Sequence, residues 1–157
     1  GYYRNEILLI PKKILGILKK KVCMGIASGR LRFEAELAFK RFRLFPYFES
    51  VVTLDECLEE EVRIFRTTGR RVTYSKPHPY SILRAIQEIG LSIPRCGYIG
   101  DVVDDMVASK AAKKKFQIIG IGFLSNPGNK KVLKESLLKA GADLVIKNPK
   151  DLLQLIF

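Results

Sequence analysis

Short apolar runs alternate along this chain with longer segments in which apolar residues recur at helical spacing. The apolar runs predict five strands, over residues 22–27, 51–54, 95–99, 117–122 and 143–146. The other segments predict helices over residues 31–44, 79–89, 104–115, 129–140 and 149–156. Residues 6–20 also show helical spacing, and Pro11 either divides that segment or opens its helix.

Strands that alternate with helices are typical of a parallel sheet, because each crossover between parallel strands is right-handed and usually carries a helix. The pattern therefore predicts an α/β fold in three layers, a Rossmann-like parallel sheet with helices on both faces. Only the charged segment 55–71 fits this pattern poorly. One interpretation is a surface excursion in which Val62–Phe65 pairs with Arg71–Tyr74 across a turn at Gly69.

Composition adds an unusual charge to this picture. The chain has 157 residues, 47% of them hydrophobic, which suits one domain with a substantial core. Lys and Arg number 28 against 16 Asp and Glu, so the formal charge is +12. A positive field attracts phosphorylated ligands or nucleic acid. The competing interpretations are solvated outer faces of helices and a surface adapted to heat.

Cysteine usage bears on the cellular setting. Cys23, Cys57 and Cys96 are odd in number and widely spaced, which excludes a disulfide framework and a zinc site. Cys23 and Cys96 lie in apolar runs, where cysteine acts as a small buried hydrophobe, so a reducing, cytoplasmic setting is expected. No apolar run approaches membrane-spanning length and no signal peptide is visible, so no membrane partner is expected.

An acidic cluster follows the third predicted strand. The apolar run Cys96–Ile99 stops at Gly100-Asp101, and Asp104 and Asp105 follow at the start of the next helix. Carboxylates gathered there suit Mg²⁺, which takes oxygen ligands and often only one or two carboxylates. Crowding these carboxylates costs repulsion that a cation would relieve. The alternative is an Asp N-cap followed by a solvated helix start.

Two further polar elements follow predicted strands. The Ser28 hydroxyl, with backbone N–H groups at Gly29 and the next helix, can hold an oxyanion. The alternative for Ser28 is an N-cap of that helix. Lys76 can neutralise a phosphate and a neighbouring carboxylate, the alternative being an exposed loop lysine. Ligands of parallel α/β folds bind outside the carboxyl ends of the strands, so these elements and the acidic cluster are expected to converge.

The ordered set Ser28-Gly29, Lys76-Pro77-x-Pro79 and Gly100-Asp101-x-x-x-Asp105 resembles the haloacid dehalogenase-like hydrolase superfamily, and most closely its phosphoglycolate-phosphatase-like branch. The likeness runs from about Val22 to Phe157. It implies a Mg²⁺-dependent phosphatase that acts on a small phosphorylated metabolite.

The resemblance also implies roles for single residues. Ser28 and Gly29 would contact the transferring phosphoryl group, and Lys76 would bind and stabilise it as a catalytic residue. Asp101 and Asp105 would serve the Mg²⁺ site, with Asp104 as the neighbouring substitute.

The family's first motif is missing from this chain. In the family, an Asp-x-Asp pair ends the first strand; one Asp attacks phosphorus to give an aspartyl-phosphate, and the other acts as general acid and base. No Asp-x-Asp occurs here, and the chain begins at Gly1 without an initiator Met. We therefore expect residues 1–21 to be a cap tail, Tyr2–Glu6, with its return helix. Residues 22–157 would be the C-terminal part of the core, inactive alone.

The resemblance places the missing strand at the centre of the sheet, between the strands 22–27 and 96–99. Its absence would leave two strand edges unpaired in the core. Each unmade buried hydrogen bond costs ~1–3 kcal/mol, against a total stability of about 5–15 kcal/mol. The isolated chain is therefore expected to be marginal or prone to aggregation, unless the gap closes or another segment supplies the strand.

Two other functions remain open from the residues alone. The charge of +12 and the absent nucleophile fit a non-catalytic domain that binds phospho-ligands or nucleic acid. A phospho-acceptor signalling domain also uses an acidic cluster, a hydroxyl and a Lys, but its only loose acceptor candidate, Asp55, follows Ser28 instead of preceding it.

Overall fold

The computed structural model describes residues 6–90, 95–125 and 128–155. Every strand pairing in it is parallel, as predicted, but the strands form two separate sheets. The first sheet pairs β1 with β2, and the second has the order β3-β4-β5. The strands are β1 Gly25–Ala27, β2 Ser50–Val52, β3 Cys96–Gly100, β4 Ile118–Phe123 and β5 Leu144–Ile146.

Six α-helices and two short 3-10 helices connect and cover the strands in the described residues. The α-helices are α1 Lys12–Lys19, α2 Arg32–Phe42, α3 Leu54–Thr68, α4 Tyr80–Ile89, α5 Val103–Ala112 and α6 Lys130–Ala140. The 3-10 helices are η2 Phe45–Tyr47 and η3 Pro149–Gln154, so the final predicted helix is 3-10 in type. Among these residues, no helix is long and apolar enough to cross a membrane.

Helices cover both faces of the sheets, which confirms the predicted three layers. On one face Ile82 and Ile86 of α4 pack against Ala108 of α5 and Ile118 of β4. On that face α6 also packs on α5 through the fully buried Leu137. On the other face, α1 packs against β4, β5 and η3, and also against α2.

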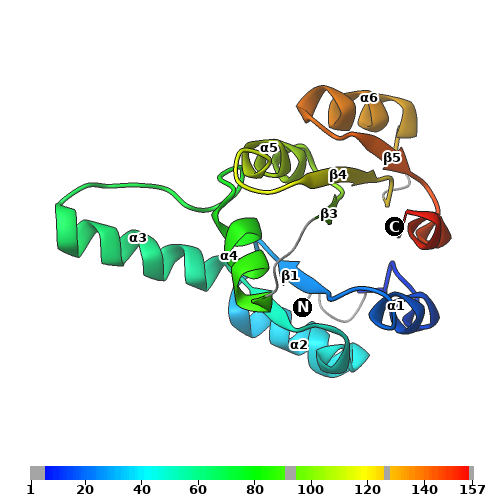
Figure 1. The fold of residues 1–157 in the computed structure, drawn as a ribbon, viewed down its shortest axis with the longest axis horizontal. Coiled ribbons are helices and arrows are strands. Elements are labelled where there is room, and N and C mark those ends of the chain that lie inside the picture. The colour runs from blue at the N-terminus through cyan, green and yellow to red at the C-terminus, as the bar shows by residue number, and fades with distance from the viewer. Residues whose placement is uncertain (1–5, 91–94, 126–127, 156–157) are drawn as a thin grey trace.

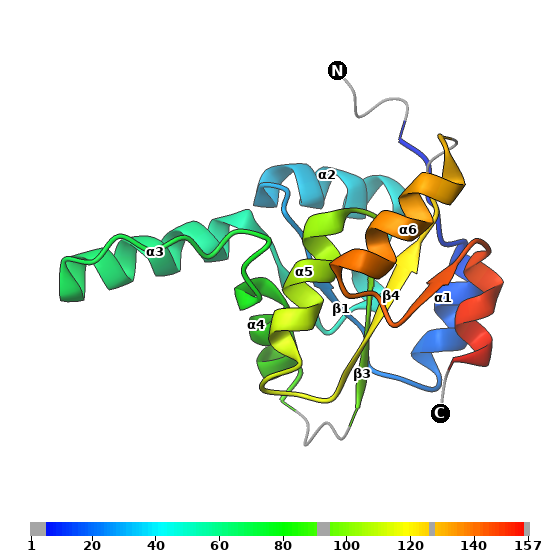
Figure 2. The same ribbon diagram turned by 90° about the horizontal axis from the view of Figure 1, so that it is seen from above.

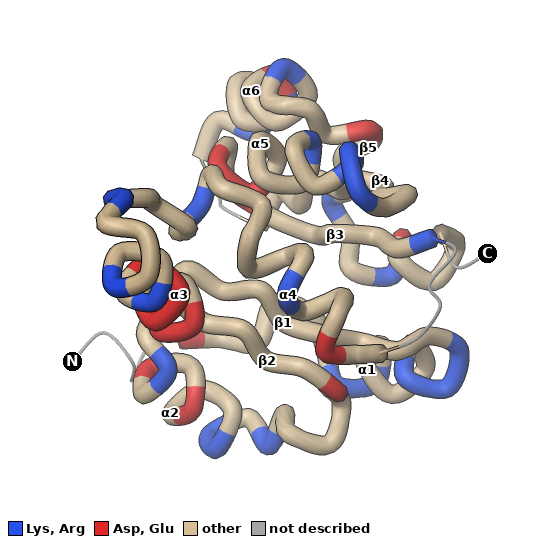
Figure 3. The backbone as a smooth tube through the Cα atoms, turned by 60° about the vertical axis from the view of Figure 1, so that its left-hand side comes forward, with Lys and Arg blue, Asp and Glu red and all other residues tan. Residues whose placement is uncertain are grey.

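The gap between the two sheets lies where the missing strand was expected. Within the described parts of the chain, no strand pairs with β1 or β3 on the sides that face each other. The helices span this break: α4 contacts β1, β2 and α5, and α1 joins the core clusters of both sheets. In Figure 3, α4 lies over the space between β3 and β1. One folded unit is therefore built around an interrupted sheet.

The ends of several elements differ from the prediction. The first strand begins at Gly25 and not at residue 22, and α1 begins at Lys12 with Pro11 as its N-cap residue. Pro11 therefore opens the helix instead of dividing it, since its lack of an N–H costs nothing there. Most of the expected cap tail, residues 2–5, lies outside the described residues. The division at residue 21 stays a prediction.

The interpretation of residues 55–71 as a paired surface excursion was wrong. This segment is largely one helix, α3, which projects from the body of the molecule (Figures 1 and 2). Thr53 and Glu56 form a capping box that starts the helix, and its Leu, Glu and Arg residues are good helix formers. Gly69 has φ 69° and ends the helix as a left-handed C-cap residue, so it makes no hairpin turn.

Candidate active site at the carboxyl ends of the strands

Lys76 lies in the gap between the two sheets and bridges them. Its Nζ donates to the Ala27 carbonyl at 2.7 Å, at the end of β1. It also donates to Tyr98 Oη at 2.5 Å and to Asp105 Oδ1 at 2.7 Å, on the side of β3 and α5. The side chains of Lys76 and Asp105 are only 14% and 9% exposed. The predicted alternative of an exposed loop lysine was therefore wrong.

Asp105 holds this cluster against β3. Its Oδ1 accepts from Tyr98 Oη at 2.9 Å, and its Oδ2 accepts from the Asp101 backbone N at 3.2 Å. Burial, and next the charge of Asp105, raise the pKa of Tyr98, so the phenol stays protonated as a donor. A Cβ at Gly100 would lie 2.3 Å from the Asp105 Cβ. Glycine at residue 100 thus allows the carboxylate of Asp105 to approach the strand end.

Asp101 follows the end of β3 and is held from β4. Its Oδ2 accepts from the Ser125 hydroxyl at 2.7 Å. The residue that caps α5 is Val102, which makes no side-chain cap bond, so the alternative of an Asp N-cap was wrong. Asp104 is exposed in the first turn of α5, away from the buried Asp105.

Ser28 follows Ala27, whose carbonyl accepts from Lys76. Its hydroxyl accepts from the Arg30 backbone N at 3.1 Å, and its backbone N donates to Val52 on β2. The N-cap residue of α2 is Leu31, so Ser28 does not cap that helix. Gly29 is exposed beside it, and a Cβ there would meet nothing within 4 Å.

A carboxylate from another element takes the place of Ser28 at α2. Asp55 Oδ2 accepts from the Arg32 backbone N, the first N–H of α2, at 2.7 Å. This acceptor leaves the Ser28–Gly29 turn free of a capping role, so the Gly29 N–H can face an anion, while the Ser28 and Arg30 N–H groups donate to Val52 and to the Ser28 hydroxyl.

The predicted residues therefore come together in part. Lys76 contacts Asp105 directly, Asp101 joins them through its backbone, and Ser28 lies one residue from the Lys76 contact at Ala27. Asp104 and Gly29 are predicted residues that make no hydrogen bond or ion pair with Lys76, Asp101 or Asp105 among the described residues.

Sequence reasoning missed Tyr98 and Ser125. A polar atom in the middle of an apolar strand was the available signal for Tyr98. Ser125 follows the end of β4, so the carboxyl-end rule that selected the other residues applied to it as well.

These side chains fit part of a Mg²⁺ site. Mg²⁺ is usually bound by one or two carboxylates and keeps several waters. Among the described residues, no donor reaches Asp101 Oδ1, so Asp101 suits a direct ligand. Asp105 suits a supporting role better, because both of its oxygens already accept hydrogen bonds. No three His, Cys, Asp or Glu side chains in these parts of the chain gather into a metal site.

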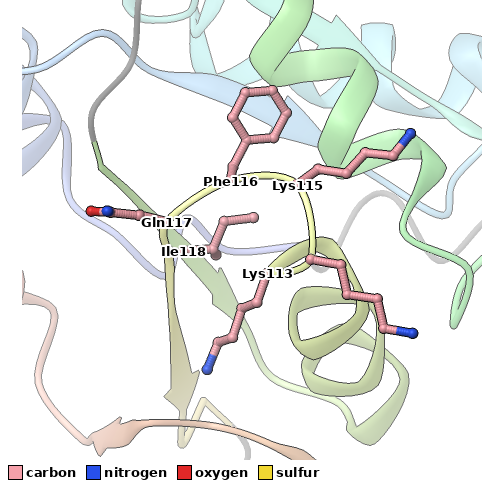
Figure 4. Close-up of a pocket in the computed structure, with 6 residues that line it drawn as sticks. Lys113, Lys115, Phe116, Gln117 and Ile118 are labelled. Carbon is pink, nitrogen blue, oxygen red and sulfur yellow. The ribbon is translucent and has the colours of Figure 1, made fainter.

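A hollow on the molecule lies away from this cluster. It is lined by residues 113–118, in the loop from α5 to β4, at the amino end of β4 (Figure 4). Lys113 there is paired with Asp143 at 2.6 Å. The hollow and the candidate site are thus at opposite ends of the strands, and the chemistry favours the carboxyl ends.

Comparisons with known proteins point to one family. A family model described as haloacid dehalogenase-like hydrolase matches residues 10–119. A pyrophosphatase PpaX from Bacillus pumilus is 27% identical over 133 residues, which cover 85% of this chain and 51% of that protein. The chain thus spans about half the length of this curated relative.

Solved structures share the fold. A hydrolase from Pseudomonas syringae is 30% identical with a TM-score of 0.64, over 90% of this chain and 55% of that one. A conserved haloacid dehalogenase-like protein from Agrobacterium tumefaciens is 22% identical with a TM-score of 0.70, over 92% and 57% of the two chains. A putative beta-phosphoglucomutase from Thermotoga maritima is 21% identical with a TM-score of 0.63, over 96% and 59%.

Proposed function

Because this chain belongs to the haloacid dehalogenase-like hydrolase family, we propose that it is the C-terminal part of the core of a Mg²⁺-dependent phosphoric monoester hydrolase. Its substrate would be a small phosphorylated metabolite. The contact of Lys76 with Asp105 and the Ala27 carbonyl, in the gap between β1 and β3, carries this proposal. This contact holds a positive charge at the carbonyl of Ala27, the residue before Ser28, and at Asp105, which accepts from the Asp101 backbone N.

Each residue would have a defined part in phosphoryl transfer. The Ser28 hydroxyl and the Gly29 N–H would donate to phosphoryl oxygens, and Lys76 would neutralise the charge that develops on them. Asp105 and Tyr98 would keep the Lys76 ammonium oriented. Asp101 would hold Mg²⁺ with water and substrate oxygens, with Asp104 as the neighbouring substitute. The ion, when bound, would add further neutralisation of phosphoryl charge.

The nucleophile would come from a segment other than these 157 residues. We place it on an added parallel strand between β1 and β3, ending in Asp-x-Asp beside Lys76. One carboxylate would attack phosphorus as the P–O bond to the leaving alcohol breaks. The second Asp would give that alcohol its proton and then take one from the hydrolytic water. In the described part of the chain, no strand pairs with the facing sides of β1 and β3, and this supports the placement.

The first test is to read the coding sequence immediately before Gly1 and to produce the longer protein. An Asp-x-Asp after an apolar run there, with Mg²⁺-dependent turnover of p-nitrophenyl phosphate, is the expected result. No turnover by the longer protein with Mg²⁺ present would overturn the proposal.

Variants of the longer protein test the proposed roles of individual residues in turnover. Asp101→Asn should lower turnover by roughly 100-fold or more, as loss of a charge-stabilising group does in other enzymes. Glu135→Gln, at an exposed position of α6, is the matched control and should leave turnover unchanged. The 157-residue chain should be inactive; turnover by it that disappears in Asp101→Asn would contradict the placement of the nucleophile.

Binding of nucleic acid stays the alternative prediction. Figure 3 shows Lys and Arg spread over several elements of the molecule instead of one continuous stripe. Binding through phosphates would weaken steeply with salt. Salt-insensitive or undetectable binding to oligonucleotides would remove this alternative.

A further inference from the structure

The arm formed by α3 and residues 69–75 projects from the body of the molecule (Figures 1 and 2). Its base is anchored, since Glu56 and Cys57 are buried, but from residue 58 onward no residue of α3 is buried. The return segment follows the helix: the Tyr74 backbone N donates to Glu61 at 2.6 Å, and the Arg71 guanidinium lies 5.8 Å from the Phe65 ring centroid. The arm is thus a defined structure with an uncovered helix.

An apolar stripe runs along this uncovered helix. Leu58, Val62 and Phe65 are spaced four and three residues apart, which places them on one face of α3. They are 43%, 47% and 48% exposed. Single exposed apolar residues are ordinary, but three in one stripe on a projecting helix form the kind of face that helices bury against a partner.

The charges of the arm are divided along its length. Residues 55–61 hold five acidic side chains and no basic one, although the whole chain has only 16 Asp and Glu. Residues 63–71 hold four Arg and no acidic residue. The stripe lies across the boundary between the two charges, with Val62 at its centre.

We propose that the apolar stripe is a dimerisation surface, on which α3 of a second copy of this chain packs antiparallel. Only this orientation sets the acidic half of each helix against the basic half of the other; parallel packing would set like charges together. Antiparallel helices also oppose their macrodipoles favourably.

The pairing is self-complementary about a two-fold axis near Val62. Leu58 of each copy would meet Phe65 of the other, and the two Val62 side chains would meet at the axis. On one flank of the stripe, Glu59 of each copy would face Arg66 of the other. Glu59 is well exposed, and its ion pair among the described residues is a peripheral one of 3.6 Å with Arg32, so it can turn toward a partner.

The small size of the apolar stripe limits the expected affinity of the dimer. The uncovered part of α3, from Leu58 to Thr68, is about 16 Å long at 1.5 Å per residue. Two such faces bury less than the ~1,200 Å² typical of stable complexes, so the dimer should be weak and should depend on concentration. Its charged flanks should make it sensitive to salt.

Sedimentation equilibrium of the full chain over a range of concentrations tests the proposal. The wild-type chain should show a monomer–dimer equilibrium that shifts to monomer in high salt. Val62→Glu puts a charge on the two-fold axis and should weaken dimerisation by at least about tenfold. The matched control is Val132→Glu, because Val132 is also a helical valine, 55% exposed on α6, and its replacement should change nothing.

Exchanging the charges of residues 59 and 66 distinguishes a loss of helix pairing between two copies from a loss of folding. Glu59→Arg and Arg66→Glu should each weaken the dimer, and the double variant should restore it, because these residues lie two turns apart within one helix and do not touch. Circular dichroism checks that each variant is folded. A monomer at all concentrations, a dimer untouched by Val62→Glu, or a double variant that stays monomeric would each overturn the proposal.

Discussion

The two sheets end at the same edge of the molecule but differ in how their strands are held. In the three-stranded half, β4 pairs on both sides, and Ile118, Ile121 and Phe123 on it are buried. In the two-stranded half, β1 pairs only with β2, and none of its residues Gly25–Ala27 is buried. The candidate site lies between these halves and takes residues from both.

This difference shows how the two sides of a gap in a parallel sheet can be held together without strand pairing. Where backbone hydrogen bonds are missing between β1 and β3, a side chain replaces them: Lys76 reaches from the Ala27 carbonyl to Asp105. The same ammonium is our proposed phosphoryl-binding group. The stability of the fold and the proposed phosphoryl binding therefore both depend on the Lys76 ammonium.

The largest loss of folding stability is expected from Lys76→Met. It leaves the buried Asp105 without its cation, and removal of one partner of a buried ion pair typically costs ~3–5 kcal/mol of unfolding free energy. Urea denaturation measures it, with Lys134→Met on the exposed face of α6 as control. The double variant Lys76→Met/Asp105→Asn should recover part of the loss. A cost below about 1 kcal/mol would mean that Lys76 does not hold the halves together.

A core truncation in the better-paired half tests whether the halves unfold together. Leu137 is 0% exposed, and Leu137→Ala should cost about 2–5 kcal/mol. The neighbouring Leu138, 41% exposed, serves as the control, and Leu138→Ala should change stability far less. Because α4 and α1 span the break, amide protection should fall in both sheets. Loss confined to β3, β4 and β5 would show that the halves are independent.

Hydrogen exchange in the longer protein, which would include the segment before Gly1, tests whether a strand fills the gap between the two sheets. If an added strand fills the gap, amide hydrogen exchange should slow by roughly tenfold or more along β1 and β3, since each restored buried hydrogen bond is worth ~1–3 kcal/mol. The amides of β5 should change little and provide the internal control. Equal slowing in all strands would indicate general stabilisation and not strand addition.

The smallest change in folding stability is expected for Glu56 at the base of the arm, and this change depends on pH. Burial acts to raise the pKa of Glu56, but hydrogen bonds from Thr53 and the charge of Arg32 outweigh it, so the pKa lies below its ordinary value. A lowered pKa stabilises the fold above the unfolded pKa of about 4.3, and this stability is lost as pH falls through the folded pKa.

Glu56→Gln should therefore cost about 1 kcal/mol near neutral pH, and the difference from wild type should shrink toward about pH 3. Thermal unfolding at several pH values measures this difference, with the exposed Glu135→Gln as control. A difference that grows as pH falls would contradict the assignment.

Much of the fold was predictable because it depends on short-range patterns. Five strands and the α-helices other than α3 follow from apolar runs and helical spacing, and each predicted strand overlaps an observed one. The missing central strand followed from the absent Asp-x-Asp, and the two separate sheets agree with it. The arm was missed because the charge of residues 55–71 obscured the Thr53–Glu56 capping box.

The site was predictable in its parts and not in its contacts. Lys76 and Asp105 were selected from their positions after strands, but the bridge to Ala27 and the participation of Tyr98 were not. Asp104 and Asp105 are adjacent in sequence, yet only Asp105 points into the core, because neighbouring residues on a helix lie about 100° apart.

The sequence by itself determined the order of the strands and of most helices, the polar residues at the strand ends and the lack of an Asp-x-Asp pair in these 157 residues, since these depend on local spacing and residue type. The tertiary structure alone decided which carboxylate is buried with Lys76, that helices span the interrupted sheet, and that α3 stands out with an uncovered apolar stripe. Those outcomes depend on contacts between residues far apart in the sequence, such as Lys76 with Ala27 and Ile14 with Ile121, whose energies no local pattern in the chain encodes.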